Sequence, residues 1–116
     1  MYLGIDLGTS AVKTILVDHA QRVVASRGRS LVTVSPRAGY SEQNPAQWID
    51  AAFATLDALK ADHPSELAAV EGIGLSGQMH GATLLDAALK PLRPCILWND
   101  GRSAAECGLL EHRWPA

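Results

Sequence analysis

Two apolar, β-rich runs at the start of the chain flank a three-residue polar tip, and they limit the folds that the chain can adopt. Residues 2–7 and 12–18 are dense in leucine, isoleucine and valine, which favours two largely buried strands. The tip between them, Gly8-Thr9-Ser10, is typical of a tight turn. The sequence therefore predicts an N-terminal hairpin on which the rest of the domain is built.

The segments after the hairpin predict an antiparallel meander and then a helix. A short turn leads to a third strand over residues 22–33. A helix is predicted from Pro45, with Asn44 as its N-cap and Gln47 as a capping-box partner, and His63-Pro64 ends it. Helical spacing predicts one core-facing set of side chains, namely Ile49, Ala52, Phe53, Leu56 and Leu59.

The second half of the chain predicts a strand that joins the meander through that helix. Residues 67–75 hold this strand, and a helical crossover makes it parallel to its neighbour in the sheet. Short strands are predicted at residues 83–86 and 95–98. A last helix is predicted over residues 102–112, with two side chains inward, Cys107 and Leu110. The order βββ-α-β, then short strands and a helix, predicts an α/β fold with a mixed sheet.

Composition excludes several classes of protein. The 116 residues suit one small domain, and a net charge of −2 lacks the basic face that nucleic-acid binding requires. Cys95 and Cys107 form no C-x-x-C pair, so reduced thiols are expected rather than a zinc or redox site. No secretory signal and no membrane-length apolar run is found, so we expect a soluble, cytoplasmic protein.

The first motif with chemistry is D-x-G-T-S-x-x-K, formed by Asp6, Gly8, Thr9, Ser10 and Lys13. A tight turn without bulky side chains lets backbone N–H groups converge on phosphate oxygens, and hydroxyls and an ammonium group add to their grip. A carboxylate beside a phosphate requires a cation between them, and Mg²⁺ prefers such oxygen ligands. We call residues 2–18 the phosphate hairpin.

The alternative interpretation is an ordinary hairpin with a polar turn, because D-x-G is common in turns. The position of Asp6 inside an otherwise apolar strand favours function, because a buried carboxylate without a partner is costly. A Walker P-loop is excluded, since G-x-x-x-x-G-K-[ST] is absent from the sequence.

The second motif is the glycine-flanked run of residues 76–81, predicted to leave the carboxyl end of the crossover strand. Ligands bind at such strand ends in α/β sheets, and the parallel pairing predicts that this run emerges beside the hairpin tip. Gln78 and His80 can hydrogen-bond hydroxyl groups, and Met79 offers an adaptable apolar wall. These side chains suit a sugar or polyol. The alternative is a loop with one solvent-exposed histidine, and no second ligand at metal spacing accompanies His80.

The third motif spans residues 96–102. Trp98 can stack on a sugar face, while Asp100 and Arg102 can bind hydroxyl groups. A structural interpretation, with a core tryptophan and a helix-capping aspartate, carries equal weight.

The phosphate hairpin, from Gly4-Ile5-Asp6 to Lys13, resembles that of the FGGY carbohydrate kinases in the actin and Hsp70 superfamily. The resemblance implies a ribonuclease H-like, actin-like ATPase fold, with ATP phosphates on residues 8–10 and Mg²⁺ at Asp6. Residues 77–81 resemble the substrate loop of the members that phosphorylate D-xylulose, which implies sugar contacts from Met79 and His80. We call residues 77–81 the sugar loop. Residues 40–45 also resemble a family segment, interpreted here as capping and sheet support.

The resemblance covers residues 1–116 as the N-terminal part of the first kinase domain. In the family, a catalytic aspartate and a second domain lie beyond the matched part, so the chain alone is expected to be inactive. Open strand edges and apolar surface predict self-association, as a homodimer. Two alternatives stay open, namely another FGGY sugar or polyol kinase, and a non-catalytic module that binds sugar or nucleotide. An acidic substrate would favour a nearby arginine or lysine, which residues 77–81 lack.

Overall fold

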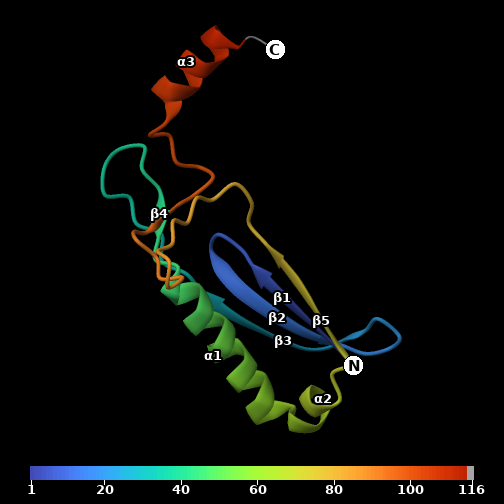
Figure 1. Ribbon diagram of the computed structural model, residues 1–116. Helices are drawn as coiled ribbons and strands as arrows, with labels where there is room; N and C mark the ends of the chain where they lie inside the picture. Colours follow the sequence, from blue (N-terminus) through green and yellow to red (C-terminus); the bar gives the residue numbers. More distant parts are fainter. Residues whose placement is uncertain (115–116) are drawn as a thin grey trace.

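A mixed sheet of four strands is the centre of the computed structural model, which describes residues 1–114 (Figure 1). The strands lie in the order β3-β2-β1-β5, and their bounds are β1 (Tyr2–Leu7), β2 (Ala11–Val17), β3 (Val23–Ser30) and β5 (Gly72–Gly77). β1, β2 and β3 form an antiparallel meander, and β5 pairs with β1 in parallel. The predicted meander and parallel crossover strand are therefore confirmed, although β5 begins later than predicted.

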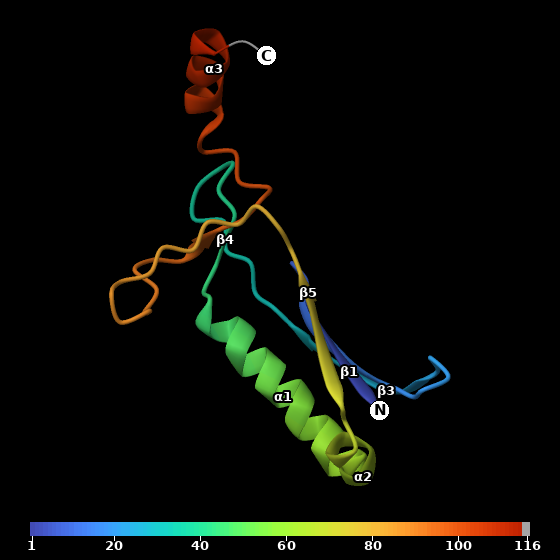
Figure 2. The same cartoon turned by 45° about the vertical axis from the view of Figure 1, so that its right-hand side comes forward.

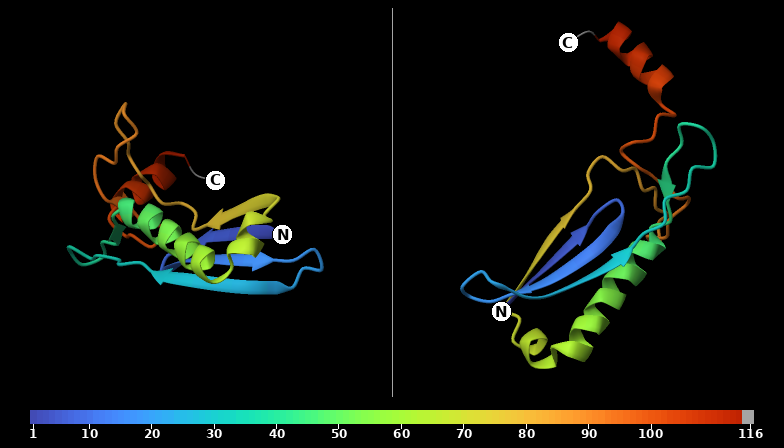
Figure 3. Two further views of the ribbon diagram at one scale, coloured as in Figure 1. Left: turned by 90° about the horizontal axis from the view of Figure 1, so that it is seen from below. Right: turned by 180° about the vertical axis from the view of Figure 1, so that it is seen from behind.

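The core lies between this sheet and helix α1 (Ala46–Asp62), which runs along one face of the sheet in two views (Figures 2 and 3). Alternate residues of each strand point toward the helix, as the period of two in a strand requires. The buried apolar side chains fall into two groups, Leu3, Leu16, Ala25 and Leu59 in one and Val12, Leu31 and Ala51 in the other.

The face of α1 that meets the sheet differs from the predicted one. Ile49 and Phe53 are 56% and 61% exposed, so their predicted burial is wrong, whereas Leu59 is fully buried as predicted. The small residues Ala51 and Thr55 occupy the centre of the contact instead. Short side chains there let the helix approach β2 and β3 closely, and Ile49 and Phe53 lie on the side of the helix that faces away from the sheet.

The start of α1 also differs from the prediction. The N-cap is Pro45 rather than the predicted Asn44, and the helix begins at Ala46; Asn44 Oδ1 accepts a hydrogen bond from the Ala46 N–H at 3.0 Å. Gln47 makes no capping box, because its amide exchanges two 2.8 Å hydrogen bonds with the backbone of Val32. This pair fixes the segment after β3 to the first turn of the helix. The predicted end at His63-Pro64 is confirmed, and the short helix α2 (Pro64–Ala68), which was not predicted, leads to β5.

A smaller two-stranded sheet lies beyond the helix N-terminus and combines β4 (Glu42–Gln43) with β6 (Cys95–Ile96). β6 lies within the predicted segment 95–98, whereas β4 was not predicted. Residues 83–86 form a single isolated bridge, between Leu85 and Pro91, so the strand predicted there is wrong. Hydrogen bonds to Gly39, Ser41 and Val34 hold these segments together as a second layer.

Helix α3 (Ala104–Arg113) projects away from the rest of the molecule (Figure 1). Its position agrees with the predicted helix, but the inward orientation of Cys107 and Leu110 is wrong, since no α3 residue is buried. No element among residues 1–114 packs against it closely enough to bury a side chain. Both cysteines are free thiols, and no described helix has the length and apolar character that a membrane crossing requires.

The Thr14 hydroxyl predicts a stabilising substitution. Thr14 is fully buried, and its hydroxyl has no hydrogen-bond partner within residues 1–114. We expect Thr14→Val to raise the free energy of unfolding by about 1 kcal/mol, because the unpaired hydroxyl loses its hydration without compensation. Urea unfolding measures this change. Thr55→Val is the matched control and should be destabilising, since the Thr55 hydroxyl donates to the Ala52 carbonyl at 2.7 Å; a destabilised Thr14→Val protein would contradict the prediction.

Candidate functional site

The tip of the phosphate hairpin and the sugar loop meet at one end of the sheet. In the parallel pairing of β1 with β5, Leu7 is the partner of Gly77. The Gln78 N–H extends this ladder by donating to the Leu7 carbonyl at 2.9 Å. A Cβ atom on Gly77 would lie 3.1 Å from the Leu7 Cβ, so a side chain at this position would require Leu7 to move and glycine favours this close approach to β1. The predicted adjacency of the two motifs is therefore confirmed.

A cleft of about 430 Å³ opens between these two motifs. It is lined by Asp6, Gly8, Thr9, Gly77, Gln78, Met79, His80 and Trp98. Most of the residues predicted from the two motifs thus share one surface, although they lie some 70 positions apart in the chain (for Thr9 and Gln78 the separation is 69). Ser10, Lys13, Asp100 and Arg102 do not line this cleft.

The hairpin tip is tight and closely hydrogen-bonded. The Gly8 N–H donates to the Ala11 carbonyl at 3.1 Å, and the Leu31 N–H donates to the Ser10 carbonyl at 2.9 Å. A Cβ atom on Gly8 would lie 3.0 Å from the Ala11 oxygen, so a side chain here would require the backbone of the turn to shift. The absence of a side chain at Gly8 leaves the backbone open toward the cleft, as a phosphate-binding turn requires.

Asp6 lies on the exposed face of the sheet, which corrects the expectation that its carboxylate is buried. The odd-numbered residues of β1, such as Leu3, turn toward the core, and the even-numbered ones turn away. Asp6 is directly opposite Lys13 in the β1–β2 pairing, and both residues line a second hollow of about 450 Å³ on this face. The carboxylate is therefore accessible to a hydrated cation at the mouth of the cleft.

Hydrogen bonds connect the tip directly to the sugar loop and to residue 98. The Thr9 hydroxyl donates to Gln78 Oε1 at 3.1 Å, and Trp98 Nε1 donates to Thr9 Oγ1 at 3.1 Å. Trp98 is 59% exposed, so it is a wall of the cleft rather than the core residue of the structural interpretation. Thr9 and Gln78 therefore form a hydrogen-bonded polar surface at the bottom of the cleft, and the exposed Trp98 ring lies beside it.

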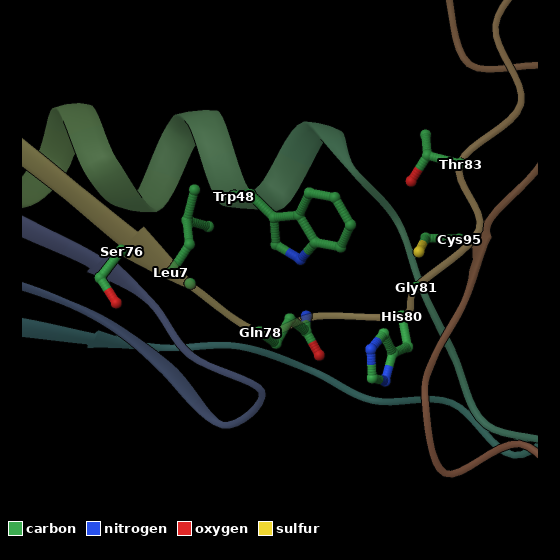
Figure 4. Close-up of a pocket in the computed structure, with 9 residues that line it drawn as sticks. Leu7, Trp48, Ser76, Gln78, His80, Gly81, Thr83 and Cys95 are labelled. Atoms are coloured by element: carbon green, nitrogen blue, oxygen red, sulfur yellow. The ribbon is translucent and has the colours of Figure 1, made fainter.

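The sugar loop separates the cleft from a third hollow of about 260 Å³, whose lining includes Trp48, Thr83 and Cys95 (Figure 4). Figure 4 shows the Trp48 indole reaching from α1 toward the segment that carries Gln78. His80 has a positive φ of 63°, a conformation that most residues adopt only when their surroundings hold them in it. Gln78 and His80 line both hollows and therefore separate them.

Asp100 and Arg102 form an internal ion-pair network. Asp100 accepts hydrogen bonds from the Arg102 guanidinium and, at 2.6 Å, from the Ser41 N–H, while Arg102 also contacts Glu42 at 2.6 Å. The guanidinium carbon lies 3.9 Å from the Tyr40 ring centroid. These contacts attach residues 98–102 to β4, so the sugar contact predicted for Asp100 and Arg102 stays a prediction.

The pKa of Asp100 predicts a pH dependence of stability. The hydrogen bonds from Arg102, with the one from the Ser41 N–H, hold the pKa of the Asp100 carboxyl well below its ordinary value of 3.8. A pKa lowered by folding adds stability that is complete above the ordinary value and is lost as the pH falls below it. We expect Asp100→Asn to lower the melting temperature at about pH 7, and the difference from the parent to shrink near pH 3. Differential scanning calorimetry across this range checks the result, and a constant difference would contradict it.

Sequence reasoning missed two contributors to this site. Gln43 was interpreted as support, yet its buried amide contacts the hairpin tip and the sugar loop. Trp48 was not identified from the sequence. The only sequence signal for Gln43 was a glutamine that follows a polar loop. This feature is too common in proteins to predict that the side chain is buried. Within residues 1–114 no cluster of three or more acidic, histidine or cysteine side chains could hold a metal ion alone.

Comparison with known proteins shows what this arrangement resembles. The model of the FGGY family of carbohydrate kinases, N-terminal domain, matches residues 1–115. The xylulose kinase from Escherichia coli (strain K12) is 52% identical over 99% of this chain. The xylulose kinase from Klebsiella pneumoniae is 55% identical over 100% of this chain. The crystal structure of a xyloylose kinase from Brucella ovis superposes with a TM-score of 0.93 at 56% identity, over 97% of this chain and 24% of that one. The chain spans 23% and 24% of the length of the two curated relatives.

Proposed function

Because this chain belongs to the FGGY family of carbohydrate kinases, we propose that it provides the N-terminal phosphate and sugar contacts of an ATP-dependent xylulokinase. Such an enzyme converts D-xylulose and ATP to D-xylulose 5-phosphate and ADP. The relatives also confirm the predicted fold, an actin-like mixed α/β sheet. The observation that supports the proposal best is the single cleft shared by Asp6, Gly8 and Thr9 on one side and Met79 and His80 on the other.

The phosphate hairpin is the proposed site for the terminal phosphates of ATP. Gly8 exposes the backbone at the tip, and the Ser10 hydroxyl is a further donor beside it. The Thr9 hydroxyl becomes a donor to phosphate when it leaves Gln78 Oε1. Lys13 lies across the strand pair from Asp6, on the exposed face, where its ammonium group adds positive potential near the tip. These groups act by orienting the transferred phosphoryl group, which is the main task of a protein in phosphoryl transfer.

The donor set of this site fits Mg²⁺ that arrives with the nucleotide. Mg²⁺ bound to a nucleotide keeps several waters and needs only one or two protein carboxylates. Asp6 supplies one exposed carboxylate at the cleft, which matches this need, whereas a cage made of protein ligands alone would require more. When bound, Mg²⁺ neutralises the charge of the phosphate oxygens. Asp6 is proposed to orient it, directly or through water.

The sugar loop is the proposed contact for the sugar. Met79 is 71% exposed at the cleft and offers an apolar surface to a carbon chain, while Gln78 and His80 face hydroxyl groups. Residues 77–81 contain no cation to pair with a carboxylate, which favours a neutral sugar over a gluconate-like acid. Asp100 and Arg102 are proposed to border the sugar by holding Trp98 and its neighbours against β4.

The activity is proposed for a polypeptide of the relatives' length. Phosphoryl transfer also needs a base for the attacking hydroxyl and a second contact for the nucleotide. Residues 1–116 by themselves are therefore expected to release no ADP. Self-association of those residues as a homodimer also stays a proposal, supported by the exposed Ile73 and Leu75 of the edge strand β5, at 63% and 79%.

A chimera tests the proposed function. The matched N-terminal segment of the E. coli xylulose kinase is replaced by residues 1–115 of this chain, and ADP release is measured with D-xylulose, ribulose, glycerol and gluconate. We expect ADP release that depends on D-xylulose and exceeds that with the other compounds. A preference for another sugar would overturn the substrate assignment. Calorimetry with D-xylulose and Mg·ATP separates a folded but non-catalytic binding module from a chimera that binds neither ligand.

A further inference from the structure

We infer that Gln43 is a positioning residue that couples the phosphate hairpin to the sugar loop, so that a ligand on one raises the affinity of the other. This inference rests on the proposed function, because it assigns a nucleotide to the hairpin and a sugar to the loop. It concerns a residue that does not line the cleft and that reaches both sides of it from behind.

The Gln43 side chain is 1% exposed, and all its hydrogen-bonding positions are used. Its Nε2 group donates to the Thr9 carbonyl at 2.6 Å and to the Thr33 hydroxyl at 2.8 Å. Its Oε1 atom accepts from Trp48 Nε1 at 2.8 Å and from Gln78 Nε2 at 3.5 Å. An amide has two donor hydrogens and one oxygen with two lone pairs, so this side chain has no remaining capacity.

The orientation of this amide is fixed by the chemistry of its partners. An indole N–H can only donate, so the oxygen of Gln43 must face Trp48. A backbone carbonyl can only accept, so the nitrogen must face Thr9. A rotated amide would place like groups together at both positions. Gln43 therefore holds the Thr9 carbonyl, and with it the hairpin tip, at one distance from helix α1.

The contacts form a closed ring around the floor of the cleft. Gln43 reaches the Thr9 backbone and the Gln78 side chain, and the Thr9 hydroxyl donates to Gln78 at 3.1 Å. A shift of the tip changes two of these three contacts, and so does a shift of the loop. Because buried polar groups are costly to leave unpaired, the tip and the loop are expected to move together. A ligand that orders the tip or the loop therefore lowers the conformational entropy that is lost when the other ligand binds.

The test uses the protein encoded by the whole reading frame that carries this chain. Isothermal titration calorimetry gives the Kd of Mg·ADP with and without saturating D-xylulose, and the ratio of the two values measures the coupling. We expect a ratio of about fivefold or more in the parent, within the usual range of coupling between sites. In Gln43→Met, which keeps the length of the side chain but none of its hydrogen bonds, the ratio should fall toward one, because only the direct hydrogen bond from Thr9 to Gln78 still connects the side chains of the tip and the loop.

Gln47→Met is the matched control. Gln47 makes two side-chain hydrogen bonds of 2.8 Å to the backbone of Val32 and none to the tip or the loop. A residue that only supports the fold would lower the melting temperature and leave the coupling ratio unchanged, which is the result expected for Gln47→Met. If Gln43→Met does not fold, Gln43→Asn replaces it, since that change keeps a neutral amide but shortens the side chain by one methylene group and so withdraws it from the Thr9 carbonyl.

Failure of the coupling and failure of the proposed function give different results in this experiment. A parent protein that binds Mg·ADP and D-xylulose with a ratio of one overturns the coupling, and so does a Gln43 variant that keeps the parent ratio. A parent that binds Mg·ADP but not D-xylulose overturns the proposed function, and the inference falls with it. Reciprocity gives a check within the experiment, because the Kd of D-xylulose must change by the same factor when Mg·ADP is present.

Discussion

Replacing Asp6 with asparagine is expected to lower kcat by about a thousandfold. The change is made in the chimera with the E. coli xylulose kinase or in a polypeptide of the relatives' length that carries this chain, which we call the kinase-length protein. The substitution keeps the size and shape of the side chain and removes its charge. Asp6 is exposed at the cleft and belongs to neither group of core side chains, so the fold should persist. The lost carboxylate is the group proposed to orient Mg²⁺ on the phosphates, and such preorganised charge is usually the largest contribution to catalysis.

The expected kinetic pattern is specific. The KM for D-xylulose should change little, because Asp6 faces the phosphate side of the cleft, whereas kcat and the dependence on Mg²⁺ should change strongly. A coupled assay of ADP release over a range of Mg²⁺ concentrations measures both. Asp57→Asn, which removes an exposed carboxylate from helix α1, is the matched control and should be neutral. An Asp6→Asn protein with more than about a tenth of the parent kcat would contradict the role proposed for Asp6.

The hairpin and the parallel crossover strand could be predicted from sequence because local signals determine them. Two apolar runs around Gly8-Thr9-Ser10 leave few alternatives to a hairpin, and the register then places Asp6 opposite Lys13. A helix between strands implies a parallel return, which brings residue 77 beside residue 7. The adjacency of the two motifs followed from topology alone, without any knowledge of side-chain packing.

The errors concern which face of an element is covered, a property that the other elements decide. Ile49 and Phe53 have the helical spacing of a core stripe, but the sheet meets α1 at Ala51 and Thr55. Asp6 was expected to be buried because its strand is apolar overall. The alternation of side chains along a strand, however, places Asp6 on the other face of the sheet from Leu3 and Ile5. Gln43 was missed because its partners come from four separate segments, which only the folded chain brings together.

Gly8→Val is expected to abolish nucleotide binding by the phosphate hairpin, with a loss of at least about a hundredfold in affinity for Mg·ATP. A Cβ atom at this position would lie 3.0 Å from the Ala11 carbonyl, and a second γ-carbon adds to the crowding. The turn must open to relieve this contact, which breaks the 3.1 Å hydrogen bond from the Gly8 N–H to the Ala11 carbonyl. The backbone N–H groups of the tip then no longer converge on one point.

The change should act mainly on the nucleotide, because the backbone of the sugar loop is held to β1 through Gly77 and Leu7. The affinity for D-xylulose should fall by no more than the coupling factor, since only the side-chain contact between Thr9 and Gln78 is disturbed. Calorimetry of the kinase-length protein with Mg·ATP and, separately, with D-xylulose measures the two affinities. Gly108→Ala is the matched control, since a Cβ atom there meets nothing within 4 Å and alanine favours the helix. Retention of parent-like Mg·ATP affinity by a folded Gly8→Val protein would contradict the role proposed for the tip, because a valine there crowds the Ala11 carbonyl and displaces the turn.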